Sequence, residues 1–113
     1  MKIQKKFNET LTREYAHGGS GTRKLLLTDN EIQNVQAMTH GFLPAKSKFD
    51  WHCHENLNEV MYVLKGQGTV RDEDGLYIYA TGDAFIFPEG VFHEIENTSD
   101  DEHEYIFIRV YKI

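Results

Sequence analysis

Cysteine, proline and long apolar runs are scarce in this 113-residue chain, and their scarcity excludes several classes of protein. The single cysteine, Cys53, cannot form an internal disulfide, as is typical of proteins in a reducing cytoplasm. No apolar run approaches the roughly 20 residues of a membrane-spanning helix. The basic segment 1–6 is not followed by the apolar stretch of a signal peptide. We therefore expect a cytoplasmic globular protein that does not enter membranes.

Positive charge is also in short supply. The chain has 12 Lys and Arg against 18 Asp and Glu, which gives a net charge of −6. Two mostly acidic clusters, 71–74 and 100–104, are interpreted as solvated turns, and His103 inside the second is expected on the surface. A surface of this sign repels nucleic acid and anionic membranes. We expect the ligand to be a small molecule instead.

Residues that favour β-structure are abundant. Hydrophobic residues make up 40% of the chain, with seven Phe and six Tyr, which argues against disorder. Short apolar runs alternate with turn signals about every ten residues, a pattern typical of a sandwich or barrel. The strands expected from these runs span 23–27, 33–42, 48–54, 59–66, 69–71, 76–79, 85–87, 91–97 and 105–112. We expect residues 1–22 to form an N-terminal arm and residues 23–113 to form a single all-β domain.

The first part of a candidate metal site lies in the segment His52-Cys53-His54-Glu55-Asn56-Leu57-Asn58-Glu59. Side chains at positions i and i+2 of a β-strand point to the same face, so His52 and His54 are expected to project together. Cys53 then turns away from them. The connection after His54 is short, and the next strand begins at Glu59. Its carboxylate is predicted to return beside the two imidazoles.

The fourth candidate ligand is His93, which follows the turn Pro88-Glu89-Gly90 on a strand expected over 91–97. Three imidazoles and one carboxylate suit Fe, Mn, Ni or Zn. Four protein ligands on a six-coordinate ion leave two positions open, as catalysis requires. We therefore predict one divalent transition metal, of open identity, held by His52, His54, Glu59 and His93.

These segments together resemble the two sequence motifs of the cupin superfamily. The second motif, G-x5-P-x-G-x2-H-x3-N, is matched at every fixed position by Gly82, Pro88, Gly90, His93 and Asn97. The first motif, G-x5-H-x-H-x3,4-E-x6-G, is matched by His52, His54, Glu59 and Gly66. Lys46 stands where the first motif begins with glycine.

The resemblance implies a double-stranded β-helix, which is the jelly-roll barrel of cupins. It also implies a homodimer, because small cupins commonly pair through their outer sheet and N-terminal strand. The superfamily includes dioxygenases, decarboxylases, isomerases, epimerases, lyases and cyclases, together with binding domains that have no catalysis. Because a fold does not determine a function, the resemblance leaves the reaction open.

Four further residues are candidates for contact with a substrate. Met61 and Phe85 are interpreted as apolar lining that keeps the site dry. His40, on the strand before the first motif, is a candidate for the mouth of the barrel. Arg109 lies in the last strand and, if it faces inward, needs an anionic partner such as a substrate carboxylate. The alternative is an outward-facing arginine.

Two functions are compatible with the complete ligand set. The first is a metal-dependent enzyme of dioxygenase, decarboxylase, isomerase or lyase type that acts on a small oxygen-bearing organic acid or sugar. The alternative is a non-catalytic module that binds or senses such a compound. The sequence places no second carboxylate or lysine in the site for proton abstraction, so it does not identify catalytic residues.

Overall fold

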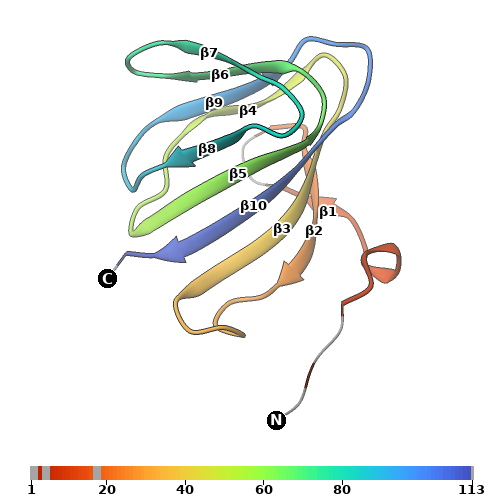
Figure 1. The fold of residues 1–113 in the computed structure, drawn as a ribbon, viewed down its shortest axis with the longest axis vertical. Helices are drawn as coiled ribbons and strands as arrows, with labels where there is room; N and C mark the ends of the chain where they lie inside the picture. Colours follow the sequence, from red (N-terminus) through yellow and green to blue (C-terminus); the bar gives the residue numbers. More distant parts are fainter. Residues whose placement is uncertain (1–2, 4–5, 17–18, 113) are drawn as a thin grey trace.

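β-Strands make up nearly all the regular structure in the computed structural model, which describes residues 3, 6–16 and 19–112 (Figure 1). The strands are β1 (Glu14–Tyr15), β2 (Thr22–Leu27), β3 (Val35–Leu43), β4 (Ser47–His52), β5 (Leu57–Lys65), β6 (Gly68–Asp72), β7 (Leu76–Tyr79), β8 (Ala84–Phe87), β9 (His93–Asn97) and β10 (His103–Tyr111). One short 3-10 turn, η1 (Asn8–Thr10), precedes them. Within the described residues, no helix has the length and apolar character to cross a membrane.

The strands form two sheets that lie over one another (Figure 1). Six strands run in the order β1-β2-β3-β10-β5-β8, and four run in the order β4-β9-β6-β7. The pairs within both sheets are antiparallel. The sheets end at β8 and β7 without joining into one closed barrel. The predicted all-β jelly-roll architecture is confirmed, with this open side as a detail that the sequence did not indicate.

Alternation of side chains along the strands builds the core between the two sheets. In β5, Glu59, Met61 and Val63 are buried, whereas Tyr62 and Leu64 point outward and are exposed. Burial of one large apolar side chain contributes about 1.5–3 kcal/mol to stability. The core consists of Leu43, Phe49, Met61, Val63, Val70, Tyr79, Phe87, Ile95, Tyr105 and Phe107. It fixes the strands that carry the candidate ligands, β4, β5 and β9.

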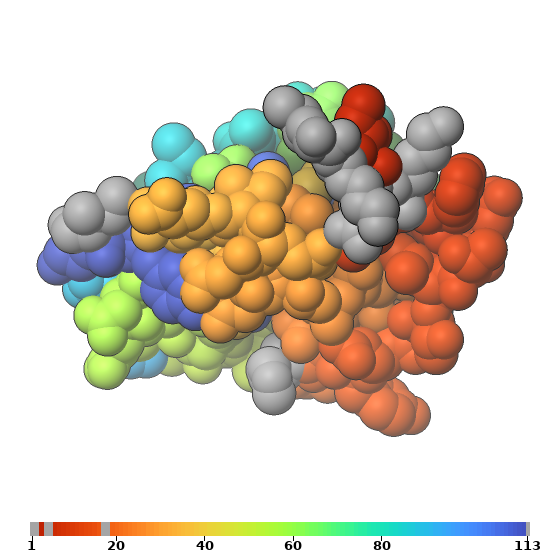
Figure 2. Space-filling view, turned by 90° about the horizontal axis from the view of Figure 1, so that it is seen from below, coloured from red at the N-terminus to blue at the C-terminus, as the bar shows by residue number. Residues whose placement is uncertain are grey.

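The N-terminal segment packs beside the six-stranded sheet. Seen from below, it lies next to the connection between β2 and β3 (Figure 2). Lys6 pairs with Glu31 at 3.0 Å, and the Nζ atom of Lys24 donates a hydrogen bond of 2.9 Å to the backbone oxygen of Asn8. A Cβ atom on Gly21 would lie 2.0 Å from the ring of Phe49, so a side chain there would displace that ring from its place in the core.

A buried polar network joins the two sheets at the start of β10, close to Gly66. The hydroxyl of Tyr79 hydrogen-bonds to the hydroxyl of Tyr105 and, at 2.6 Å, to Nδ1 of His103, whose Nε2 lies 2.9 Å from the hydroxyl of Ser99. Gly66 has a φ of +116°, and a Cβ atom there would lie 2.2 Å from the imidazole of His103. His103 is only 2% exposed, so its predicted surface position is wrong.

This burial predicts a pH dependence of folding. Burial lowers the pKa of His103 below its ordinary value, with the charge of Lys65 acting in the same direction and Asp101 opposing it. The unfolded chain therefore takes up the proton first, and stability is complete above about pH 6.5 and lost as the pH falls below it. We expect the free energy of unfolding, measured in urea between about pH 8 and pH 5, to fall more steeply for the wild type than for His103→Gln.

The glutamine variant separates His103 from the other groups that titrate in this range. His52 has its pKa lowered as well, first by burial, but it is present in both proteins and cancels in the difference. Parallel pH curves for the two proteins would show that His103 does not carry the effect.

Candidate metal centre

Three imidazoles converge between the sheets. His52 is the last residue of β4, His93 is the first residue of β9, and the two are cross-strand partners. His54 lies just beyond β4, on the connection that leads to β5. One ring nitrogen from each of the three lies within 4.8 Å of the others. The structure thus brings together three of the four predicted ligands.

Backbone contacts fix how two of these rings are oriented. Nδ1 of His52 lies 2.5 Å from the backbone oxygen of Asp50, and Nδ1 of His93 lies 3.0 Å from that of Val91. A backbone oxygen only accepts, so in each case Nδ1 carries the proton and Nε2 keeps a lone pair. This is the tautomer in which Nε2 is able to bind a metal ion.

Two ring nitrogens of the triad are buried without a hydrogen bond from the part of the chain that the structure describes. Within the described residues, Nε2 of His54 and Nε2 of His93 are buried and make no hydrogen bond. A buried polar atom without a partner costs about 1–3 kcal/mol, so such atoms are uncommon unless a ligand serves them. A divalent cation between the imidazoles would serve both at once. The donor set therefore fits a metal ion.

Glu59 completes the arrangement from β5. Its side chain is 2% exposed, and its Oε1 atom lies 3.5 Å from Nε2 of His54 and 3.6 Å from Nε2 of His93. Its Oε2 atom accepts a hydrogen bond of 2.8 Å from Nε of Arg109. Burial opposes ionisation, yet the charge and hydrogen bond of the Arg109 guanidinium help to hold the pKa of Glu59 well below its usual range. Glu59 is thus a carboxylate with one oxygen directed at the imidazoles.

The four predicted substrate residues occupy different environments. Arg109 faces inward, because it is the cross-strand partner of Glu59 on β10. Met61 lies fully inside the core, and Phe85 packs against that core parallel to the ring of Phe87. His40 projects from the other face of β3, where it stacks on Phe42 and its Nε2 lies 2.8 Å from a carboxylate oxygen of Glu104. The structure therefore brings Arg109 to the site and leaves His40 outside it.

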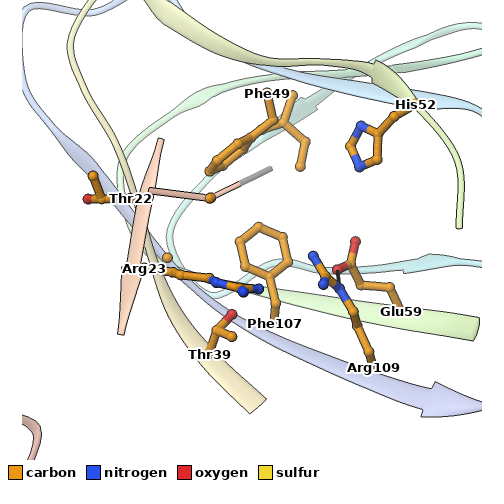
Figure 3. A pocket seen from close by; sticks show the side chains of 11 residues that line it. Thr22, Arg23, Thr39, Phe49, His52, Glu59, Phe107 and Arg109 are labelled. Atoms are coloured by element: carbon orange, nitrogen blue, oxygen red, sulfur yellow. Dashed lines mark hydrogen bonds and ion pairs between the residues drawn. The ribbon is translucent and has the colours of Figure 1, made fainter. Parts of the chain in front are cut away.

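A cavity of about 30 Å³ opens next to His52 and Glu59 (Figure 3). The residues that line it are Ala16, Thr22, Arg23, Thr39, Gly41, Phe49, His52, Glu59, Ile95, Phe107 and Arg109. Of these, Arg23 is the functional candidate that the sequence analysis missed. The available signal was a positive charge at the start of an otherwise apolar strand over 23–27. Figure 3 shows its side chain extending into the cavity from β2.

Aromatic residues stand at the surface beside the triad. Trp51 precedes His52, is partly exposed and stacks on Phe92 with ring centroids 5.8 Å apart. The guanidinium of Arg71 lies 4.3 Å from the centre of the Trp51 ring. The side chain of Trp51 is thereby held between a cation and a second ring.

Comparison with known proteins gives a consistent result. A family model described as "Cupin domain" matches residues 39–109. The chain is 32% identical over 94 residues to a Thermotoga maritima protein named oxalate-binding protein. The matched region covers 80% of this chain and 78% of the relative. It is 30% identical over 101 residues to an oxalate decarboxylase of Arthroderma benhamiae, of which it spans only 24%.

Solved structures show the same fold at lower identity. A structure described as a predicted oxalate decarboxylase from Thermotoga maritima superimposes with a TM-score of 0.85 at 24% identity, over 99% of this chain and 100% of that one. The polyketide cyclase of Streptomyces resistomycificus superimposes with a TM-score of 0.84 at 15% identity, over 98% of this chain and 81% of that one. Proteins with different described roles thus share this fold.

Proposed function

This chain belongs to the cupin family, and on that premise we propose that it binds a small carboxylate anion through one divalent transition metal ion. The observation that carries the proposal is the pair of buried Nε2 atoms on His54 and His93, which make no hydrogen bond among the described residues. Both face Oε1 of Glu59, and Glu59 lines a cavity whose walls also include Arg23 and Arg109. The two buried ring nitrogens support a bound cation, and the arginines in the cavity support an anionic ligand.

The metal would be held by ring nitrogens of His52, His54 and His93 and by Oε1 of Glu59. When bound, such an ion acts as a Lewis acid toward carboxylate oxygens of the ligand. Arg109 donates a hydrogen bond to Oε2 of Glu59. This contact fixes the carboxylate so that Oε1 points toward the imidazoles, where the metal would bind. The imidazole and carboxylate set suits Fe, Mn, Ni or Zn.

The size and charge of the cavity favour an organic acid over a sugar. Its volume of about 30 Å³ suits a small ligand. Guanidinium groups recognise carboxylates through two parallel hydrogen bonds, whereas a sugar offers no charge to them. The name of the Thermotoga maritima relative, oxalate-binding protein, supports the same ligand class.

Turnover of the bound acid is the second candidate function. The names of the Arthroderma benhamiae relatives, which are oxalate decarboxylases, favour it. The cavity walls favour binding alone, because among the described residues Glu59 is the only carboxylate that lines the cavity and no lysine does. Its Oε2 atom is held by Arg109, so it is poorly placed to exchange a proton.

Calorimetry with oxalate tests the proposal. Elemental analysis first identifies the metal in protein purified without chelators, and oxalate is then titrated into the metal-loaded and the metal-free protein. We expect saturable binding only to the loaded form. Equal binding to both forms, or no binding with any of Fe, Mn, Ni and Zn, would contradict the proposal. Release of formate and carbon dioxide from oxalate would instead show that the protein decarboxylates the bound acid.

A further inference from the structure

We propose that Arg23 is a second anion-binding residue, so that the ligand is a short dicarboxylate whose carboxylates bind at opposite ends of the cavity. This inference rests on the proposed function, since the first carboxylate is the one that the metal would hold. It adds a residue and a narrower ligand class: a short acid with two carboxylates.

The strand register separates the backbone positions of Arg23 and Arg109 along β3. Arg23 is paired with Gly41 across β2 and β3, whereas Arg109 is paired with Ala37 across β10 and β3. Gly41 and Ala37 are four residues apart on β3, which is about 13 Å of strand. Both side chains line the same cavity, and they reach into it from different strands (Figure 3).

The wall between the two arginines suits a short hydrocarbon chain. Thr39 lies midway on β3, and its partner on β10 is Phe107. The rings of Phe49 and Phe107 pack edge to face, and with Ile95 they supply apolar surface to the cavity. Apolar surface between two cationic ends matches the methylene groups of a diacid. The small volume sets an upper limit on its length.

The hydrogen bonding of Arg23 leaves it able to take a ligand. Its side chain is 17% exposed, and its only hydrogen bond within the described residues runs from Nε to Oε1 of Glu14, at 3.1 Å. A guanidinium has five N–H donors, so the two terminal amino groups remain for a carboxylate. Such a contact, made by both amino groups, is among the stronger hydrogen bonds in proteins.

Arg23 and Arg109 differ in how far a nearby carboxylate balances their positive charge. The charge of Arg109 is offset inside the protein by the buried carboxylate of Glu59, at 2.8 Å. The partner of Arg23 is Glu14, whose side chain is 48% exposed, so water and salt screen that pair. The positive field of Arg23 therefore reaches the cavity with little compensation, and a second negative group on the ligand would neutralise it.

Acids of equal length with one or two carboxylates test this assignment. Malonate and succinate are titrated into the full chain loaded with its metal, and propionate and butyrate serve as the matched monoacids. We expect Arg23→Gln to weaken binding of the diacids at least about tenfold and to leave the monoacids nearly unchanged. Arg23→Lys keeps the charge without the planar fork, so its loss should be intermediate.

Glu14→Gln is the matched control for a structural role. It breaks the same ion pair but retains the guanidinium, so it should keep the preference for diacids. If it reproduces the loss seen in Arg23→Gln, or if Arg23→Gln weakens diacids and monoacids equally, Arg23 is not a second anion site, while metal-dependent binding of acids still stands. If the wild type binds none of these acids or oxalate in the presence of metal, the proposed function fails with it.

Discussion

Protein with His93 replaced by alanine is expected to lose its metal during a purification that leaves close to one ion on each wild-type chain. His93 is a buried member of the triad, its Nε2 atom has no partner among the described residues, and Oε1 of Glu59 lies 3.6 Å away. Loss of a group that only supports a ligand lowers metal affinity about 10–100-fold, and loss of a ligand itself should exceed that. Elemental analysis and competition with a chelator of known affinity measure the change.

The matched control is His40→Ala. That imidazole is also partly buried and hydrogen-bonded, but it lies on the outer side of β3. It should retain the metal content and affinity of the wild type. Since His93 stacks on Phe87 at 3.9 Å, its removal also costs packing, and circular dichroism must show that the variant is folded. A folded His93→Ala protein with wild-type affinity would contradict the predicted ligand set.

Arg109→Met is expected to lower the free energy of unfolding of the metal-free protein by about 3–5 kcal/mol. Glu59 is almost completely buried and its Oε2 atom is paired with Arg109 at 2.8 Å. Removal of the arginine leaves a buried carboxylate without its cationic partner, which costs more than the pair contributes. Urea denaturation followed by circular dichroism measures the loss. Bound metal should reduce it, because a cation at Oε1 also compensates the charge.

Two further variants isolate the cause. Arg71→Met removes an exposed arginine whose Nη2 atom lies 3.5 Å from Oε2 of Glu94, and it should cost no more than about 1 kcal/mol. Adding Glu59→Gln to Arg109→Met removes the stranded charge and should recover much of the stability. If Arg109→Met lowers the free energy of unfolding as little as Arg71→Met does, the buried pair does not stabilise the fold as predicted.

The motif spacing predicted most of the candidate metal centre, although only His52 and His93 lie on neighbouring strands. The i and i+2 rule placed His52 and His54 together even though β4 ends at His52. The structure also shows why Lys46 could replace the first glycine of the motif: its φ of +57° is the left-handed conformation that glycine adopts without strain. A lysine adopts it at a modest cost.

The direction in which individual side chains point could not be predicted as well as the positions of the metal ligands. β10 carries large residues on both faces, so its sequence left the direction of Arg109 open. β3 likewise mixes polar and apolar residues, and His40 falls on the outer face because Thr39 and Gly41 face inward. His103 was misplaced because its acidic neighbours indicated a turn, whereas its burial depends on Gly66 and Tyr79 far along the chain. The predicted homodimer stays a prediction.

The position of Trp51 gives this protein a natural optical probe. It is the chain's only indole, it directly precedes His52, and it stacks on Phe92 under the guanidinium of Arg71. All tryptophan emission therefore originates at one place, a single residue away from the imidazole triad. Ions with unpaired electrons quench nearby fluorophores and zinc does not, so quenched emission from unlabelled protein would report that an ion with unpaired electrons fills the centre.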